Sequence, residues 1–377
     1  MSERPASGRV SAFAPASVSN VACGFDVLGF AIAGAFEEAG DAAPLGDVVH
    51  ASAASTPGAA LVLVTGDGGR LPHDSGRNTA AVAAAAVLER CRATLPAETL
   101  PGVSLELEKG MPLASGLGSS AASAVAAVVA THELARAHGA EPLDARELVR
   151  CALAGERVAS GGEHADNVAP SLLGGFVLIR SLDPEPELVD LPVPAGLSCA
   201  VVRPHLEVAT QAARAALGER IALRAAIAQW GNVGALVAAL HRGDLDLLSR
   251  ALHDAVAEPV RAGAVPGFAA AMAAARAAGA LGGSLSGSGP SLFALAPDDE
   301  AARRAVAAMA NAIADEGIAC DRLVTPAGGP GAHCLEAASL EAPSLEASGL
   351  EAPGEPSSDR SAGIQGSERA DGEERSR

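Results

Sequence analysis

Hydrophobic and polar positions follow two periods along this chain. Short alternating runs predict strands, and longer runs with helical spacing predict helices. The predicted strands are Val10–Ala14, Asp47–Ala54, Ala60–Thr65, Val103–Lys109, Leu197–Arg203, Leu292–Ala296 and Cys320–Thr325. The predicted helices are Thr79–Arg92, Ala121–His138, Ala145–Ala159, Ile221–Arg242, Asp244–Ala257, Gly267–Ala278 and Asp299–Glu316. Ser160–Pro170 and Ser181–Leu191 fit neither period and are expected to be loops. The pattern indicates an α+β protein.

A glycine-rich stretch lies between the strand that ends at Lys109 and the helix that follows. It consists of Pro112, Leu113, Ala114, Ser115, Gly116, Leu117, Gly118, Ser119, Ser120, Ala121 and Ala122. Its glycines permit turns that a side chain would block, and the helix start offers unpaired N–H groups to an anion. The stretch has no lysine and matches neither the Walker nor the dinucleotide-binding glycine pattern. We therefore predict a phosphate-binding loop of another type, or, as the simpler alternative, a helix start after a tight turn.

Polar residues gather in further segments. Asn20 and Asp26 lie in a loop between apolar runs, either facing a cleft or capping their own turn. His164 and Asp166 stand in the glycine-rich segment Ser160–Pro170, eight and ten residues after Glu156, which lies near the end of a predicted helix. Asn78 is expected first as a helix cap and second as a nucleotide contact. Thr210 and Arg214 are one helical turn apart and share a face. Arg261 is either functional or a surface charge.

Composition narrows the classes of function. The net charge of −18 argues against a general nucleic-acid or anionic-membrane binder. The six cysteines have no paired spacing, so reduced thiols in a cytoplasmic protein are expected. No apolar signal segment or membrane-spanning run is apparent, and we expect no membrane partner. Residues 335–377 repeat Leu-Glu-Ala with a five-residue period and carry ten acidic residues against four arginines, which is typical of a disordered acidic tail.

Together the motifs resemble those of the GHMP kinase superfamily. Pro112–Ala122 is similar to the central phosphate-binding motif, Leu285–Ser291 to the C-terminal glycine motif, and Ala14–Ala16 to the opening motif. Within the superfamily, Gly24–Gly29, His164–Pro170 and Glu258–Arg261 resemble the homoserine kinase family. The similarity extends from about Val10 to His333 and leaves the tail outside.

The resemblance implies two domains: an ATP-binding domain at 8–175, similar to ribosomal protein S5 domain 2 and with a left-handed crossover, and a ferredoxin-like domain at 176–334. It implies that Pro112–Ala122 and Asn78 contact ATP and that Ser120 and Glu156 hold Mg²⁺. It also implies that the acceptor, L-homoserine, is phosphorylated for threonine biosynthesis, and that a homodimer is possible. The implied acceptor-binding residues are Asn20, Asp26, His164, Asp166, Arg214 and Arg261, with Asn20, Asp26 and Thr210 at the transfer centre.

The charges of these residues suit an amino acid. Arg214 and Arg261 can pair with a carboxylate, while Asp26 and Asp166 can bind an ammonium or hydroxyl group. The only lysine, Lys109, precedes the glycine loop, so no lysine–aspartate base pair is evident and we expect direct phosphoryl transfer. Two alternatives stay open: a related kinase acting on another alcohol, and a non-catalytic protein that binds a nucleotide or metabolite.

Overall fold

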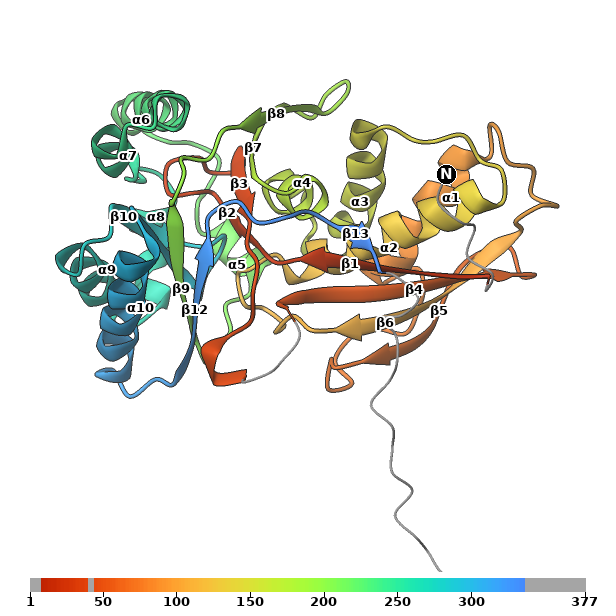
Figure 1. The fold of residues 1–377 in the computed structure, drawn as a ribbon, viewed down its shortest axis with the longest axis horizontal. Helices are drawn as coiled ribbons and strands as arrows, with labels where there is room; N and C mark the ends of the chain where they lie inside the picture. Colours follow the sequence, from red (N-terminus) through yellow and green to blue (C-terminus); the bar gives the residue numbers. More distant parts are fainter. Residues whose placement is uncertain (1–7, 40–43, 336–377) are drawn as a thin grey trace, which may run out of the picture. The chain divides into compact units, whose positions relative to one another are not determined.

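A five-stranded sheet is built mainly from N-terminal residues (Figure 1). The computed structural model describes residues 8–39 and 44–335. The strand order is β13-β1-β4-β6-β5, and β5 alone pairs in parallel, with β6. The bounds are β1 (Arg9–Pro15), β4 (Gly46–Ala54), β5 (Gly58–Thr65), β6 (Gly102–Lys109) and β13 (His333–Cys334).

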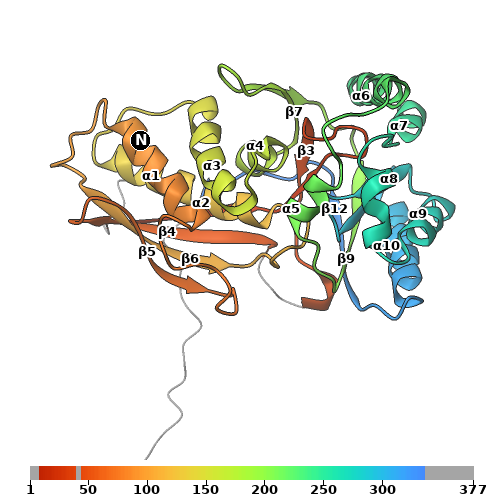
Figure 2. The same cartoon turned by 180° about the vertical axis from the view of Figure 1, so that it is seen from behind.

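Three helices lie on the same side of this sheet: α1 (Thr79–Cys91), α2 (Ser119–Ala137) and α3 (Ala145–Ser160) (Figures 1 and 2). Helix α2 packs on β1 and β4 and is buried along most of its length, because its Ala and Val side chains let neighbouring elements approach closely. Helix α3 also packs closely on α1, since a Cβ at Gly155 would lie 2.4 Å from the Thr79 carbonyl oxygen. The phosphate-loop candidate therefore leads into a buried helix, α2.

A second, antiparallel sheet has the order β10-β11-β9-β12. Its strands are β9 (Ser198–Pro204), β10 (Gly282–Leu285), β11 (Leu292–Ala296) and β12 (Cys320–Pro326). Helices α9 (Phe268–Ala277) and α10 (Asp299–Ala314) pack against it and bury a separate cluster of Ala, Val, Leu and Met side chains.

A third sheet joins strands from distant parts of the chain in the order β2-β3-β7-β8. The bounds are β2 (Ser17–Ser19), β3 (Leu28–Ala31), β7 (Phe176–Ser181) and β8 (Glu187–Leu191), with α4 (Ala165–Leu173) packed beside β3. Phe30 stacks on Phe176 with ring centroids 4.4 Å apart. Because β7 pairs with β3 and β13 with β1, strand pairing shows no break near Gly175, and the division into 8–175 and 176–334 stays a prediction.

The remaining elements are α5 (Thr210–Ala215), α6 (Leu223–Arg242), α7 (Leu245–Ala251), α8 (Glu258–Arg261) and the 3₁₀ turns Glu37–Ala39 and Ala262–Ala264. One sequence expectation is wrong here: α6 is long and apolar enough, by length and composition, to cross a membrane. Its many Ala, Leu and Val residues raise the mean hydropathy to 1.2 despite scattered polar positions. Two of those, Gln229 and Asn232, donate hydrogen bonds to the carbonyl oxygens of Cys23 and His253.

Most strand and helix predictions are confirmed to within two or three residues, but one helix prediction and two loop predictions are wrong. Ser160–Pro170 is not a loop throughout, because α4 begins at Ala165 and contains Pro170. Ser181–Leu191 contains β8, which pairs with β7. The helix predicted at Asp244–Ala257 ends at Ala251. In the first two cases tertiary packing, of α4 on β3 and of β8 beside β7, decides what the local pattern leaves ambiguous. The predicted disordered tail lies, from residue 336 on, outside the described residues.

Candidate active site

The predicted site residues meet at one cavity of about 530 Å³. Its walls come from the 19–26 loop, the glycine loop before α2, the ends of α3 and α4, α5, α8 and the Gly287–Ser288 turn. The predicted residues that line it are Asn20, Asp26, Leu113, Ala114, Ser115, Gly116, Gly118, Ser119, Ser120, Glu156, His164, Asp166, Thr210, Arg214 and Arg261. The fold thus brings most of the candidates to one place.

The glycine loop has the backbone geometry that its sequence predicts. Gly116 and Gly118 have φ of 77° and 73°, in the left-handed region that favours glycine. Gly118 is the N-cap of α2 and has no side chain that could accept from the helix. The first-turn N–H groups of α2 therefore face the cavity without an N-cap hydrogen bond. Helix N-termini of this kind attract anions. Four members of the motif, Pro112, Leu117, Ala121 and Ala122, are not among the lining residues, and the last three are fully buried in the core.

The second glycine-rich stretch, Leu285–Ser291, is hydrogen-bonded to the first. Ser286 Oγ donates to the Gly116 carbonyl oxygen at 2.7 Å, and the Ser291 N–H donates to the Ser115 carbonyl oxygen at 3.2 Å. A Cβ at Gly116 would lie 2.6 Å from the Gly289 carbonyl oxygen, so this contact requires glycine. The two motifs, about 170 positions apart in sequence, therefore form one structural unit.

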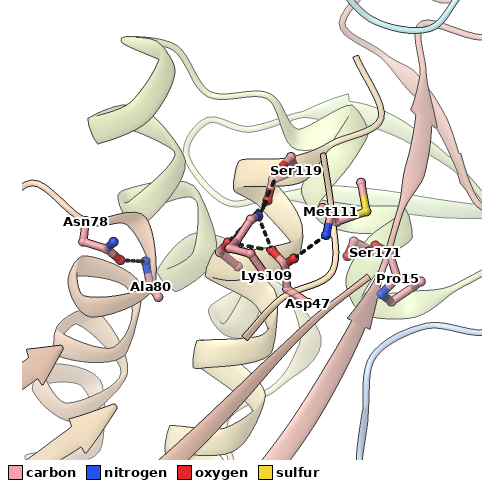
Figure 3. A network of polar contacts seen from close by, with 9 residues as sticks. Pro15, Asp47, Asn78, Ala80, Lys109, Met111, Ser119 and Ser171 are labelled. Atoms are coloured by element: carbon pink, nitrogen blue, oxygen red, sulfur yellow. Dashed lines mark hydrogen bonds and ion pairs between the residues drawn. The ribbon is translucent and has the colours of Figure 1, made fainter. Parts of the chain in front are cut away.

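Lys109 is the functional candidate that sequence reasoning passed over. Its Nζ atom lies 2.5 Å from Asp47 Oδ2 and donates to Ser119 O, Ser119 Oγ and Ser123 Oγ at 2.9–3.0 Å (Figure 3). Asp47 also accepts from Ser123 Oγ and from the Met111 N–H. Lys109 thus ties β4, β6 and the first turn of α2 together at the cavity wall. Its position as the only lysine, just before the loop, was the available signal.

The loop from Asn20 to Asp26 has an unusual backbone. Asn20, Val21, Ala22 and Asp26 all have positive φ, between 42° and 69°. Such conformations cost energy in non-glycine residues and persist where the surroundings hold them. Asn20 Oδ1 accepts from the Asp26 N–H, and Asn20 Nδ2 donates to the Gly287 carbonyl oxygen, both at 3.1 Å. Asn20 therefore acts as a clamp between this loop and the second glycine stretch, in addition to lining the cavity.

Two arginines approach the Asp26 side of the cavity from separate helices. Arg214, on α5, donates to both carboxylate oxygens of Asp26, at 2.8 and 2.6 Å. Arg261, at the end of α8, is buried and donates from Nη1 to the Gly287 carbonyl oxygen at 3.0 Å. Asp254 accepts from the N–H groups of Ala257 and Glu258 at the start of α8. The sequence pattern gave no indication of these contacts.

An acid–histidine cluster forms another part of the wall. His164 Nδ1 lies 3.1 Å from Glu156 Oε1. Burial opposes the imidazolium, but the hydrogen bond to Glu156 and nearby carboxylates outweigh it and raise the pKa of His164. Burial, reinforced by the charge of Asp26, raises the pKa of Asp166 to about 7, although His164 opposes the shift. Asp166 Oδ1 is buried with no hydrogen-bond partner among the described residues.

The position of Asp166 follows from α4. Pro170 has no N–H to donate to the Asp166 carbonyl oxygen one turn earlier. That carbonyl faces Gly29 of β3, where a Cβ would lie only 1.8 Å away. Close packing of β3 on α4 therefore fixes the start of the helix, with Asp166 in its first turn.

Thr210 and Asn78 complete the predicted set. Thr210 begins α5 and lines the cavity, with its Oγ1 3.4 Å from Ser288 Oγ. Asn78 is confirmed as the N-cap of α1, because its Oδ1 accepts from the Ala80 N–H. Its Nδ2 donates to the Pro72 carbonyl oxygen, and Asn78 is not a lining residue of the cavity. The alternative prediction for Asn78, a nucleotide contact, stays a prediction.

Ser120 and Glu156 both line the cavity. A hydroxyl and a carboxylate are hard oxygen donors of the kind that Mg²⁺ accepts, usually together with water and substrate phosphates. Within residues 8–39 and 44–335 no group of three His, Cys, Asp or Glu side chains is arranged to hold a metal by itself. The two residues thus fit a metal shared with a phosphate ligand rather than a site made by protein alone.

Comparison with known families agrees with the geometry. The model of the GHMP kinases N terminal domain matches residues 78–175, and that of the GHMP kinases C terminal domain matches residues 236–315. The first match contains the glycine loop, Glu156, His164 and Asp166. The second contains Arg261 and the second glycine stretch. These matches, together with the solved structure described next, confirm the prediction of two domains and the prediction of an α+β fold.

Similar proteins extend the match to nearly the whole described chain. Homoserine kinase from Chlorobium phaeobacteroides is 46% identical over 86% of this chain and 99% of its own. That from Chloroherpeton thalassium is 47% identical over 76% of this chain and 86% of its own. The crystal structure of homoserine kinase from Cytophaga hutchinsonii is 42% identical, covers 89% of this chain and 100% of its own, and superposes with a TM-score of 0.78. The chain therefore belongs to the homoserine kinase family of the GHMP kinases.

Proposed function

We propose that this enzyme transfers the γ-phosphoryl group of ATP to the hydroxyl of L-homoserine, giving O-phospho-L-homoserine for threonine biosynthesis. The observation that carries the proposal is the composition of one cavity. An open helix N-terminus for phosphates and a carboxylate–guanidinium surface for a zwitterion face the same space. Family membership supports both a kinase activity and this acceptor.

The ATP phosphates would lie along the glycine loop. The first-turn N–H groups of α2 would donate hydrogen bonds to the phosphate oxygens, and Ser119 would remain in place through its bonds to Lys109. The rigid α2 helix supports this arrangement, because a fixed donor array needs no reorganisation when charge shifts during transfer.

Mg²⁺ would be held by Ser120 and Glu156 together with phosphate oxygens. When bound, the metal would neutralise the phosphate charge that develops during transfer. The His164 hydrogen bond fixes Glu156 Oε1, so His164 orients this carboxylate as well as lining the acceptor side.

The acceptor would bind between the arginines and the acid cluster. Arg261 has no ion-pair partner within 4 Å in the described parts of the chain and is available to a carboxylate. Arg214 adds a second guanidinium, already balanced by Asp26. The buried, unpartnered Asp166 Oδ1 suits the acceptor ammonium, and Asn20 and Asp26 would orient the hydroxyl near Thr210.

Direct transfer needs alignment and charge neutralisation more than a strong base. Both oxygens of Asp26 accept from Arg214, which favours an orienting role for this carboxylate. The hydroxyl proton would then leave to the transferred phosphate or to solvent. Asp26→Asn is expected to lower kcat with L-homoserine. Nearly full turnover of this variant at saturating substrate would rule out Asp26 both as a base and as an orienting group.

A parallel assay tests the function and its alternatives. ATP consumption is measured with L-homoserine, mevalonate and galactose, and we expect turnover with L-homoserine alone. Turnover with one of the others would support a related alcohol kinase. No turnover with any acceptor, in the presence of Mg²⁺, would support a non-catalytic binding protein.

Three further proposals accompany the activity. We propose a cytoplasmic location, which the six free cysteines support, since no disulfide joins them. We propose a homodimer, testable by sedimentation, and a domain division at 8–175 and 176–334, testable by limited proteolysis. Nucleic acid is not expected as a partner, because the chain is strongly acidic.

A further inference from the structure

Phe25 stands beside both arginines of the acceptor side. The Arg214 Cζ atom lies 5.5 Å from the Phe25 ring centroid, and the Arg261 Cζ atom lies 5.2 Å from it. Both distances fall within the range of a cation–π contact. Phe25 itself is half-buried and does not line the cavity, whereas Arg214 and Arg261 do. The ring therefore contacts the two cations without reaching the cavity.

The two guanidinium groups that contact this ring need something to hold them. They come from different helices, α5 and α8, and their like charges repel. Asp26 balances Arg214, but Arg261 is held only by the carbonyl oxygens of Ala213 and Gly287 among the partners seen in the described chain. Burial, with a further contribution from Arg214, lowers the pKa of Arg261, although the charges of Asp26, Asp254 and Asp166 oppose the shift. An aromatic face is one of the few groups that attracts both cations without neutralising either.

The backbone gives Phe25 a fixed place for this task. The next residue, Asp26, has φ of 61°, and its N–H is held by Asn20 Oδ1. The Gly24 N–H donates to the Asn20 carbonyl oxygen at 2.7 Å, and the Leu28 N–H to the Gly24 carbonyl oxygen at 2.9 Å. Phe25 is therefore presented from a turn that is hydrogen-bonded on both sides.

We propose that Phe25 is a positioning residue that holds Arg214 and Arg261 in converging orientation for the carboxylate of the amino-acid acceptor. This rests on the proposed function and adds a residue that acts through the arginines rather than on the substrate. Because the carboxylate is the group that both arginines would bind, Phe25 determines how strongly the enzyme prefers an acceptor that carries one.

The experiment compares Phe25→Leu, which keeps an apolar side chain and removes the π-face, with Phe25→Tyr, which keeps the face. Steady-state kinetics are measured with L-homoserine and with its carboxamide, which retains the ammonium and hydroxyl but lacks the negative charge. Phe36→Leu is the matched control, because Arg203 lies 5.7 Å from that ring and Phe36 does not line the cavity.

For Phe25→Leu we expect KM for L-homoserine to rise roughly ten-fold, from the loss of two cation–π contacts, with KM for ATP unchanged. The preference for L-homoserine over the carboxamide, measured as the ratio of kcat/KM values, is expected to fall by the same factor. Phe25→Tyr is expected to restore both values, and Phe36→Leu to leave them as in the parent enzyme.

The outcomes separate the inference from the function. If the parent enzyme phosphorylates L-homoserine and Phe25→Leu lowers kcat/KM equally for both acceptors, Phe25 is a packing residue and the inference is overturned alone. An unchanged KM for L-homoserine in Phe25→Leu overturns it as well. If the parent enzyme does not phosphorylate L-homoserine, the proposed function fails and the inference fails with it.

Discussion

Lys109 and Asp47 form a buried ion pair at the point where the glycine loop meets α2, with Nζ and Oδ2 2.5 Å apart. The pair joins the end of β6 to the start of β4, and Lys109 continues to the Ser119 carbonyl and hydroxyl groups (Figure 3). Two charges that are buried away from solvent offset the cost of their desolvation only when both charges and their hydrogen-bond partners are present. The phosphate loop therefore depends on two residues outside its own motif.

Lys109→Met is expected to destabilise the protein by about 3–5 kcal/mol, because it leaves the Asp47 carboxylate buried and uncompensated. The denaturant midpoint gives the free energy of unfolding. KM for ATP is also expected to rise, since Ser119 loses its anchor.

The double variant Asp47→Asn/Lys109→Met is expected to recover part of the stability. The exposed pair Arg303 and Asp299 provides the control, and Arg303→Met is expected to cost below about 1 kcal/mol. A Lys109→Met cost as small as that of the control would contradict a structural role for the buried pair.

Gly116→Ala is expected to disrupt ATP binding. The new Cβ would meet the carbonyl oxygens of Gly289 and Ser286 at 2.6 and 2.7 Å, and φ of 77° is itself unfavourable for alanine. We expect a kcat/KM for ATP at least roughly ten-fold lower, because backbone and not a flexible side chain must move. Steady-state kinetics with varied ATP measure this.

Gly139→Ala is the matched control, because Gly139 also has positive φ, 103°, but no atom lies within 4 Å of the added Cβ. It is expected to lower the melting temperature without changing KM for ATP. Equal kinetic effects in the two variants would show that conformational strain, and not contact between the two glycine motifs, is responsible.

The raised pKa of Asp166 predicts a pH-dependent stability. The native state binds a proton at this carboxyl up to pH about 7, while the unfolded state releases it near the ordinary value of about 4. The unfolding free energy contributed by Asp166 therefore falls as pH rises from about 4 to 7. Asp166→Asn removes this contribution, so the variant is expected to gain stability relative to the parent enzyme across that range.

Two neighbours affect the comparison. Asp26 raises the Asp166 pKa, and His164 lowers it. His164 has a raised pKa of its own, so its contribution also declines as pH rises; because the Asp166 charge helps to raise that pKa, this contribution is smaller in Asp166→Asn. Urea unfolding at several pH values is the measurement, with the exposed Asp246→Asn as control. A constant difference between Asp166→Asn and the parent enzyme would contradict the prediction.

Glu156→Gln is expected to raise the Mg²⁺ concentration for half-maximal activity about ten-fold or more, since it removes a charged oxygen from the proposed metal site. The amide oxygen still offers His164 an acceptor. Activity is measured against Mg²⁺ at fixed ATP. Glu163→Gln, which breaks an exposed pair with Arg157, is the control. Identical Mg²⁺ curves for Glu156→Gln and the parent enzyme would remove Glu156 from the metal site.

Local sequence pattern predicted much of the fold because its signals are short-range. Asn78 caps the helix that it was expected to cap, and β11 has the predicted bounds. Where the pattern failed, the missing information was long-range. Helix α4 contains a proline and is stabilised by β3, and β8 is a strand because β7 lies beside it.

The sequence by itself determined which reactive groups the protein has: a glycine loop before a helix, and a set of acids and arginines that suits a zwitterion. It also determined the family that these motifs resemble. Only the tertiary structure decided which groups act together. Lys109 is a buried anchor, Asp26 is already paired with Arg214, and Phe25 lies against both arginines. These relationships join residues up to about 240 positions apart, and their energies depend on distance and burial. No local pattern of residues contains either quantity.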